Sequence, residues 1–312
     1  MKALIIGASG FVGGYLAEHL SRDLGWSVAF TKLMHESISD TIHAVHDVDI
    51  LDKSAVRQVL EIERPEYVFH LAAQSSVADS WKNPALTVDV NIKGSLNVLD
   101  TVRELESGLR VVLVGSGEEY GHVQPGELPV SENNFIRPGN IYAATKACQN
   151  MIGKIYAQAY GLYVIMTRAF NHIGPGQSET FVVSDFCKQV AEIEKGLRPP
   201  VINVGNLAAR RDFSDVRDVV RAYGILAQRG ESGETYNIGS GNAVSIREIL
   251  DEILSLSSVV ITVNEDPAKF RPIDVPLIMA NINKLRQDTD WRPTISLGKS
   301  LKDTLAFWRE KV

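Results

Sequence analysis

Short apolar runs alternate with amphipathic stretches of helical period along the first half of the chain. Short apolar runs bounded by turn residues are typical of buried parallel strands, and amphipathic stretches are typical of the helices that cover them. The strand-like runs are 2–6, 27–31, 67–71, 110–115 and 162–168, of which 67–71 is expected to be the fourth strand and 162–168 the sixth. The clearest helical stretches are 83–105 and 142–160. This alternation predicts an α/β fold with a Rossmann-type doubly wound parallel sheet.

The alternation of strands and helices ends near residue 170, where the periodicity becomes mixed. We therefore expect a larger domain over 1–170 and a smaller, mixed α/β domain over 171–312. Segments around 205–242 are expected to return to the first sheet.

Composition narrows the class of protein. The 312 residues are 45% hydrophobic and 22% charged, with a net charge of −6. An acidic protein offers no footprint for nucleic acid or an anionic membrane surface. The two cysteines, Cys148 and Cys187, give neither a metal-binding spacing nor a disulfide framework. The apolar run at the start is too short for a signal sequence, so we expect a cytoplasmic protein.

A glycine-rich turn follows the first predicted strand and opens a helix. Its spacing is Gly-x-x-Gly-x-x-Gly, formed by Gly7, Gly10 and Gly13, with Phe11 and Val12 at the helix start. Glycines allow close backbone approach, and a helix N-terminus offers N–H groups and a positive dipole to a pyrophosphate. The glycines could form a purely structural turn, but their position directly after the first apolar strand favours a dinucleotide site.

The stretch from Tyr142 to Lys146 places a phenol and an ammonium four residues apart, on one face of a predicted helix. A nearby cation favours the phenolate and should move the pKa of Tyr142 toward neutrality. Ser116 follows a buried strand and could place a hydroxyl beside this pair, although a serine at a strand end is more often a cap. Together the three residues predict a proton-transfer site.

With the glycine turn, this Ser, Tyr and Lys resemble the short-chain dehydrogenase/reductase family, and the glycine spacing resembles its extended branch. The resemblance implies an NAD(P)-dependent oxidoreductase in which Ser116 binds the substrate oxygen, Tyr142 transfers a proton and Lys146 also holds the nicotinamide ribose. Asn91, in a helical Asn-x-x-Gly pattern, would support the site.

The resemblance also implies further cofactor contacts. The second strand ends at Thr31-Lys32, where an acidic residue usually selects NAD. Lys32 therefore favours NADP(H), with NAD(H) possible, unless it is a solvated surface lysine. The other cofactor residues that the resemblance implies are Asp49, Ile50, Leu71, Ala72 and Ala73.

Within the extended branch, the run 169–177 is similar to enzymes that act on GDP-mannose derivatives. Arginine forks suit phosphate oxygens, and a carboxylate can accept both ribose hydroxyls. His172 is a weaker candidate base, because a buried structural histidine is commoner. The substrate residues that the resemblance implies are Ser76, Ser116, Asn171, Phe181, Val182, Asn206, Arg211, Arg271 and Asp274.

The reaction that the resemblance implies is hydride transfer to C4 of a GDP-linked 4-keto-6-deoxy sugar, which gives GDP-D-rhamnose. The resemblance also implies that the enzyme is a homodimer. The near alternative is GDP-mannose 4,6-dehydration. Glu118 matches the position of the glutamate that, in the dehydratases, handles the protons at C5 and C6. In the dehydratases that the chain resembles, the corresponding run is Thr, then Ser or Asp, then Glu, whereas Gly117 here has no polar side chain. A non-catalytic dinucleotide-sensing module is the remote alternative, with no need for the Ser, Tyr and Lys.

Overall fold

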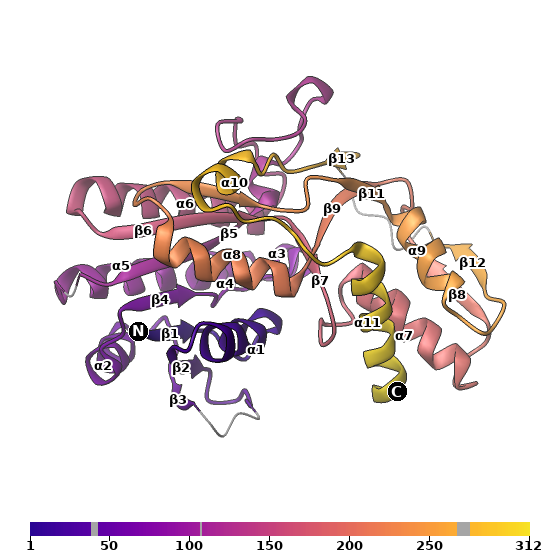
Figure 1. The fold of residues 1–312 in the computed structure, drawn as a ribbon, viewed down its shortest axis with the longest axis horizontal. Helices are drawn as coiled ribbons and strands as arrows, with labels where there is room; N and C mark the ends of the chain where they lie inside the picture. The colour runs from indigo at the N-terminus through magenta and orange to yellow at the C-terminus, as the bar shows by residue number, and fades with distance from the viewer. Residues whose placement is uncertain (39–42, 107, 267–274) are drawn as a thin grey trace.

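The computed structural model describes residues 1–38, 43–106, 108–266 and 275–312. Its centre is a seven-stranded sheet with the strand order β10-β6-β5-β4-β1-β2-β3 (Figure 1). Every neighbouring pair is parallel. The strands are β1 (Lys2–Ile6), β2 (Ser27–Lys32), β3 (Ala44–Asp47), β4 (Tyr67–His70), β5 (Arg110–Ser116), β6 (Tyr163–Ala169) and β10 (Thr235–Ile238).

Both faces of this sheet are covered by helices, which explains why its strands are continuous apolar runs. Successive side chains of a strand point to opposite faces, so Ala3 and Ile5 lie in one core cluster and Leu4 and Ile6 in another. The first face is covered by α1 (Phe11–Glu18) and α8 (Val216–Arg229), and the second by α2 (Lys53–Glu63), α5 (Ser95–Glu104) and α6 (Ile141–Tyr160).

The predicted helix over 83–105 is present but is not uniform. It consists of α4 (Pro84–Val88), a π-helical segment (Asp89–Gly94) and α5, with the short helix α3 (Val77–Lys82) before it. Such π-helical segments inside helices are frequent at functional sites. Asn91 lies within this segment and is fully buried.

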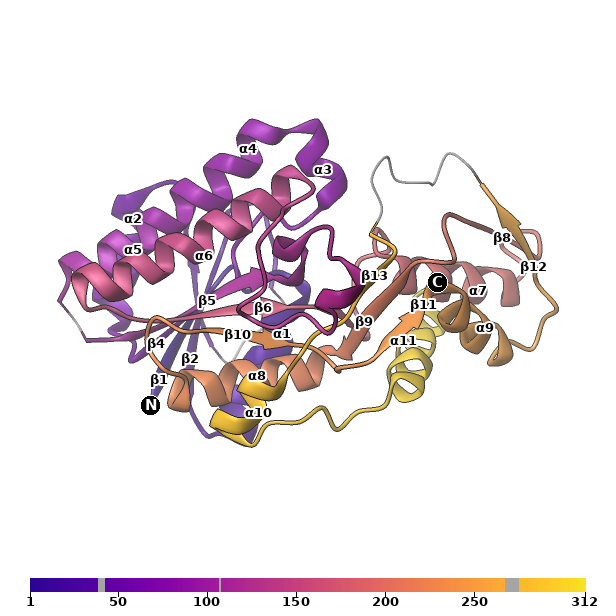
Figure 2. The ribbon, with the colours of Figure 1, turned by 90° about the horizontal axis from the view of Figure 1, so that it is seen from above.

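A smaller lobe lies beside the large sheet and has a core of its own (Figure 2). One sheet contains β11 (Ala243–Ser245), β9 (Arg210–Asp215) and β13 (Leu277–Ile278), with β7 (Asn171–Ile173) also paired to β9. A second sheet pairs β8 (Val201–Val204) with β12 (Thr262–Glu265). The helices of the lobe are α7 (Val182–Glu194), α9 (Ile246–Ser255) and α11 (Leu297–Lys311).

The chain crosses between the two parts more than once. After β9 it returns to the large sheet as α8 and β10, and α10 (Asn283–Thr289) packs against both of these elements. Two buried carboxylates fix the crossing. Asp212 accepts the N–H groups of the 240–241 turn at 2.7 and 3.0 Å, and Asp218 accepts those of 294–295 at 2.9 and 2.8 Å. Within the segment 205–242, β10 thus belongs to the large sheet, α8 covers that sheet, and β9 belongs to the smaller sheet.

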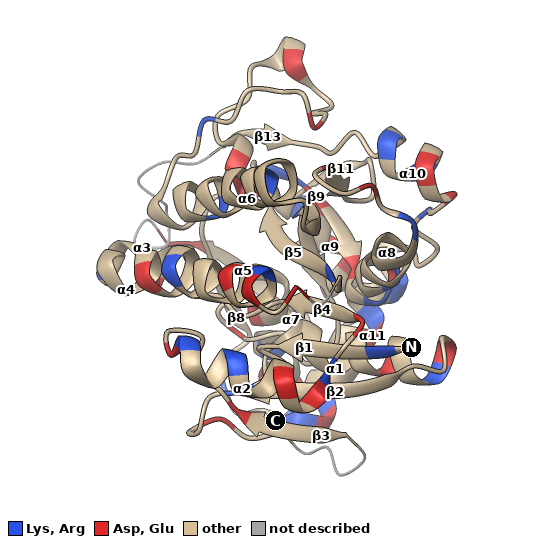
Figure 3. Ribbon diagram, turned by 90° about the vertical axis from the view of Figure 1, so that its left-hand side faces the viewer, with Lys and Arg blue, Asp and Glu red and all other residues tan. Residues whose placement is uncertain are grey.

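Basic and acidic residue positions are mixed along the helices in the ribbon of Figure 3. Between α2 and α5, for example, Lys53 pairs with Asp100 at 2.8 Å and with Glu104 at 2.6 Å. Among the described residues, no helix is both long and apolar enough to cross a bilayer.

Candidate active site

The predicted site residues of the first domain gather at one edge of the large sheet. Strands β1, β4 and β5 are parallel, so their carboxyl ends meet at the same edge. The glycine turn follows β1, residues 71–73 follow β4, and Ser116 ends β5. Ligands of open α/β sheets bind at this edge.

The glycine turn has the backbone geometry that a pyrophosphate site requires. Gly7 has a φ of +84°, and a Cβ there would lie 2.6 Å from the backbone of Ala72. A Cβ on Gly13 would lie 2.1 Å from the Ala8 carbonyl oxygen. Gly10 precedes α1 and provides no side-chain cap for the N–H groups at the helix start. These residues fit a dinucleotide, because a helix dipole and backbone amides at this place would suit its phosphates.

Residues 71–73 lie against this turn. The amides of Leu71 and Ala72 both donate to the Ile6 carbonyl oxygen, at 2.9 and 2.8 Å. Ala73 continues the same partly buried segment. Ala72 lies directly against Gly7, and its small side chain permits this close approach.

Further along the same edge, the charge of Lys32 is paired with a neighbouring carboxylate. Its ammonium forms an ion pair with Asp47 and donates to the Leu33 carbonyl oxygen. Asp49 is exposed and accepts the Leu51 amide at 2.9 Å, while Ile50 is buried in the core. Lys32 therefore reaches the expected region, but its charge is balanced by a neighbour.

Ser116 and Tyr142 lie beside each other at the centre of the site, close enough for the Ser116 hydroxyl to influence the Tyr142 phenol. Asn140 fixes the start of α6, because its Oδ1 accepts the Ala143 amide at 2.8 Å. The Nδ2 of Asn140 donates to Glu118 at 3.3 Å. Asn140 was not predicted, although an Asn directly before a helix is a recognisable N-cap.

The expectation that Lys146 lowers the pKa of Tyr142 is wrong for this structure. Burial raises the pKa of Tyr142 above its ordinary value, and the carboxylates of Glu118 and Glu119 raise it further. The neighbouring Ser116 hydroxyl acts in the opposite direction. Tyr142 is therefore a protonated phenol, suited to donate a proton.

Lys146 faces the strand beneath this hydroxyl pair. Its buried ammonium donates to the Val114 carbonyl oxygen at 2.8 Å and to Gln149 Oε1 at 3.0 Å. Burial lowers the pKa of Lys146 to about 8, and the charge of Glu119 opposes that shift. The ammonium is thus engaged by β5 and α6 instead of by the phenol.

A buried polar network holds the backbone of Ser116. Glu119 is fully buried; one carboxylate oxygen accepts the Ser116 amide at 2.9 Å and the other accepts Arg168 Nε at 2.8 Å. Arg168 also donates to the Tyr120 hydroxyl at 3.0 Å, which donates to Asn237 at 2.6 Å. Burial raises the pKa of Glu119 to about 7, against the opposing charge of Arg168. The sequence signal that was missed is an arginine inside an otherwise apolar strand.

Asn91 connects two parts of the site, as expected. Its side chain accepts the Gln74 amide at 2.8 Å and donates to the Gln74 carbonyl at 3.0 Å and to Thr145 at 2.9 Å. Ser76, predicted to bind substrate, caps α3 by accepting the Asp79 amide at 3.1 Å.

The turn at the start of α1 also contacts the smaller lobe. The Phe11 ring stacks on His172 with a centroid separation of 6.1 Å, and the Tyr15 hydroxyl donates to the Pro175 carbonyl at 2.7 Å. His172 Nδ1 bonds the Phe170 carbonyl at 3.0 Å, and burial lowers its pKa, which agrees with a structural histidine. Val12, the second residue of α1, packs against the core.

The predicted substrate residues of the smaller lobe lie on neighbouring elements. Asn171 on β7 pairs with Phe213 of β9, two residues beyond Arg211 on the same strand. Arg211 donates to the Arg210 and Val275 carbonyl oxygens, and Asn206 accepts the Ala208 amide at 3.0 Å. Phe181 and Val182 are 41% and 36% exposed at the start of α7. Arg271 and Asp274 lie outside the described residues.

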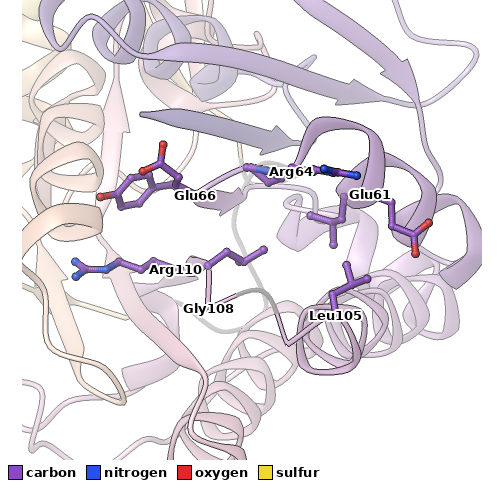
Figure 4. Close-up of a pocket in the computed structure, with 10 residues that line it drawn as sticks. Glu61, Arg64, Glu66, Leu105, Gly108 and Arg110 are labelled. Atoms are coloured by element: carbon purple, nitrogen blue, oxygen red, sulfur yellow. The ribbon is translucent and has the colours of Figure 1, made fainter.

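The site is distinct from an open pocket of about 560 Å³ at the opposite edge of the sheet (Figure 4). That pocket lies where β4 and β5 begin, and its lining includes Glu61, Arg64, Glu66, Leu105 and Arg110. Its mixed charges select no single class of ligand.

Comparisons with known proteins agree with this geometry. The sequence model of the family described as GDP-mannose 4,6 dehydratase matches residues 4–304. The GDP-6-deoxy-D-mannose reductase of Pseudomonas aeruginosa is 30% identical over 100% of this chain and 98% of that protein. The GDP-mannose 4,6-dehydratase of Yersinia enterocolitica is 29% identical over 98% of this chain and 93% of that protein.

Solved structures share the whole fold. The structure of RMD from Pseudomonas aeruginosa complexed with NADPH matches with a TM-score of 0.88 at 30% identity, over 100% of both chains. The UDP-glucose 4-epimerase of Thermus thermophilus in complex with NAD matches with a TM-score of 0.90 at 29% identity, over 100% of both chains. The predicted Rossmann-type fold is confirmed, and the chain belongs to the GDP-mannose 4,6 dehydratase family of extended short-chain dehydrogenases/reductases.

Proposed function

We propose that the chain reduces the C4 keto group of GDP-4-dehydro-6-deoxy-D-mannose and produces GDP-D-rhamnose. The cofactor is NADP(H) by preference, as in the 30% identical neighbour complexed with NADPH, with NAD(H) as the second choice. In this proposal the larger part holds the dinucleotide and the smaller lobe holds the sugar nucleotide.

The side chains at the carboxyl edge suit carbonyl reduction. A bound nicotinamide supplies the hydride. Tyr142, as a protonated phenol, donates the proton to O4, and Ser116 donates a hydrogen bond to the same oxygen. Lys146 keeps a positive charge beneath the site and binds the nicotinamide ribose. The glycine turn and residues 71–73 hold the rest of the dinucleotide.

Recognition of the GDP part is assigned to the smaller lobe. The guanidinium of Arg211 suits a phosphate, and the exposed Phe181 and Val182 offer an apolar surface beside the N-terminus of α7. Asn171 and Asn206 supply amide groups, and Ser76 contributes from the end of the segment after β4.

The packing around Gly117 is the observation that favours reduction over dehydration. A Cβ at this position would lie 3.0 Å from the ring of Phe170, which is tighter than ordinary contact. Gly117 has no polar side chain, and the serine or aspartate expected there in a dehydratase would crowd the Phe170 ring. Departure of a C6 hydroxyl would lack that polar support.

The dehydratase remains the second candidate because of Glu118, whose carboxylate lies near Tyr142 and accepts from Asn140. We expect stoichiometric oxidation of NADPH with the 4-keto-6-deoxy sugar, and little turnover of GDP-mannose with catalytic NADP. The products can be separated by chromatography and identified by NMR. Conversion of GDP-mannose to the keto-sugar that is lost in Glu118→Gln would establish the dehydratase instead.

The pH dependence of reduction should follow Lys146. Its pKa, lowered by burial to about 8, means that the ammonium is charged below that pH and neutral above it. The pKa of Tyr142 is raised, so its proton is retained over the same range. We expect kcat/KM to be flat below about pH 8 and to fall above it. In Lys146→Arg, whose guanidinium stays charged, the break near this pH should disappear, whatever the absolute rate. A break that persists would assign it to another group.

A cytoplasmic homodimer completes the proposal. Five apolar side chains on α3, α4 and α6 are 42 to 55% exposed: Trp81, Leu86, Val88, Met151 and Ile155. Because α3 and α4 both pack against α6, they support a self-complementary face. The two cysteines are free thiols, which suits a reducing compartment.

A further inference from the structure

A carboxylate lies beside the glycine turn although none directly follows the second strand. Glu36 Oε2 accepts the Ser9 hydroxyl at 2.6 Å and the Leu33 amide at 2.8 Å. Ser9 belongs to the glycine turn, and Leu33 directly follows β2. The fold thus brings an acidic side chain to the place between these two segments.

The geometry of this carboxylate leaves one oxygen available. Both hydrogen bonds end on Oε2, and within the part of the chain that the structure describes Oε1 has no hydrogen-bond partner. Glu36 also has no ion-pair partner among those residues, whereas the nearby Lys32 is paired with Asp47. The negative charge of Glu36 is therefore not neutralised by a side chain of the described residues, and the charge of Lys32 is.

In dinucleotide-binding folds, the gap between the glycine turn and the end of the second strand receives the adenosine ribose. A carboxylate there accepts a hydrogen bond from a 2′-hydroxyl and repels a 2′-phosphate. Ser9 and the Leu33 amide hold the Glu36 side chain at this place, so its orientation is set before a ligand arrives.

We propose that Glu36 reads the 2′ position of the adenosine ribose, so that it weakens binding of NADP(H) relative to NAD(H). It acts against the preference expected from Lys32 and makes the site able to use both dinucleotides. The inference rests on the proposed use of a nicotinamide dinucleotide and does not depend on the sugar substrate.

The test measures binding of NADH and of NADPH to the purified full chain by calorimetry, with no sugar present. Glu36→Gln keeps the shape and the acceptor oxygen but removes the charge. We expect the ratio of the NADH Kd to the NADPH Kd to rise about tenfold in this variant, as for loss of one close charge contact. Glu18→Gln is the control, since Glu18 lies at the other end of α1 and pairs with Arg22 on the surface; its ratio should equal that of the wild type.

A second pair of probes isolates the ribose. The ratio of the 5′-AMP Kd to the 2′,5′-ADP Kd should rise in the same variant, although neither probe contains nicotinamide. An unchanged ratio in Glu36→Gln, or an equal rise in Glu18→Gln, would overturn the proposal. Failure of the wild type to bind either dinucleotide would overturn it as well. Failure to reduce the keto-sugar, with these ratios as expected, would contradict only the assigned substrate.

Discussion

Tyr142→Phe is expected to lower kcat for reduction of the keto-sugar by at least about 100-fold, because general acid catalysis typically contributes 10² to 10⁴. The variant loses only the hydroxyl that lies beside Ser116, and it keeps the aromatic ring. Binding of the dinucleotide should be retained. Steady-state kinetics with saturating cofactor would measure the loss, and calorimetry would measure the binding.

Tyr156→Phe is the matched control for this change. Tyr156 lies on the same helix, α6, and its hydroxyl bonds Asp100 at 3.1 Å, away from the sheet edge that carries Ser116. The control should keep the wild-type kcat. Equal activity in the two variants would remove Tyr142 as the proton donor.

Arg168→Met is expected to lower the free energy of unfolding by about 3 to 5 kcal/mol, because it leaves the buried Glu119 carboxylate without its cation. Arg168 and Glu119 are 5% and 0% exposed. The measurement is urea unfolding at about pH 8, above the raised pKa of Glu119, so that the ion pair is fully charged in the wild type.

Arg137→Met tests whether burial causes that loss. Arg137 and Glu127 form a bidentate pair at 2.8 and 2.9 Å, but Arg137 is 42% exposed. Removing an exposed pair of this kind costs up to about 1 kcal/mol. A similar cost for both arginines would contradict the role assigned to burial of Arg168.

Local sequence patterns were sufficient for most of the large sheet. The run 3–6 is apolar throughout because alternate residues enter two cores, and each core is closed by its own helices. The helix over 142–160 was predicted from its period, and the structure begins it one residue earlier, at Ile141. The contribution of β9 to the smaller sheet was not predicted, since pairing between distant strands leaves little trace in local periodicity.

The candidate site was predicted only where motifs are local. The glycine turn and Ser116 lie at one edge because each stands at the end of a strand, and Tyr142 on α6 lies beside Ser116. Glu119 was not predicted, because its partner Arg168 is 49 residues away and an isolated glutamate reads as a surface residue. The direction of the Lys146 ammonium also depends on a distant group, the Val114 carbonyl oxygen.

The return of the chain to the large sheet has a consequence for synthesis on the ribosome. Until residues 235–238 are made, β6 is the edge of the sheet and exposes unpaired backbone groups. Until α8 is made, the face that contains Ala3 and Ile5 lacks one of its two covering helices. A nascent chain of 170 residues therefore presents an open edge and an apolar face, and cannot complete its fold before the smaller lobe has begun to emerge.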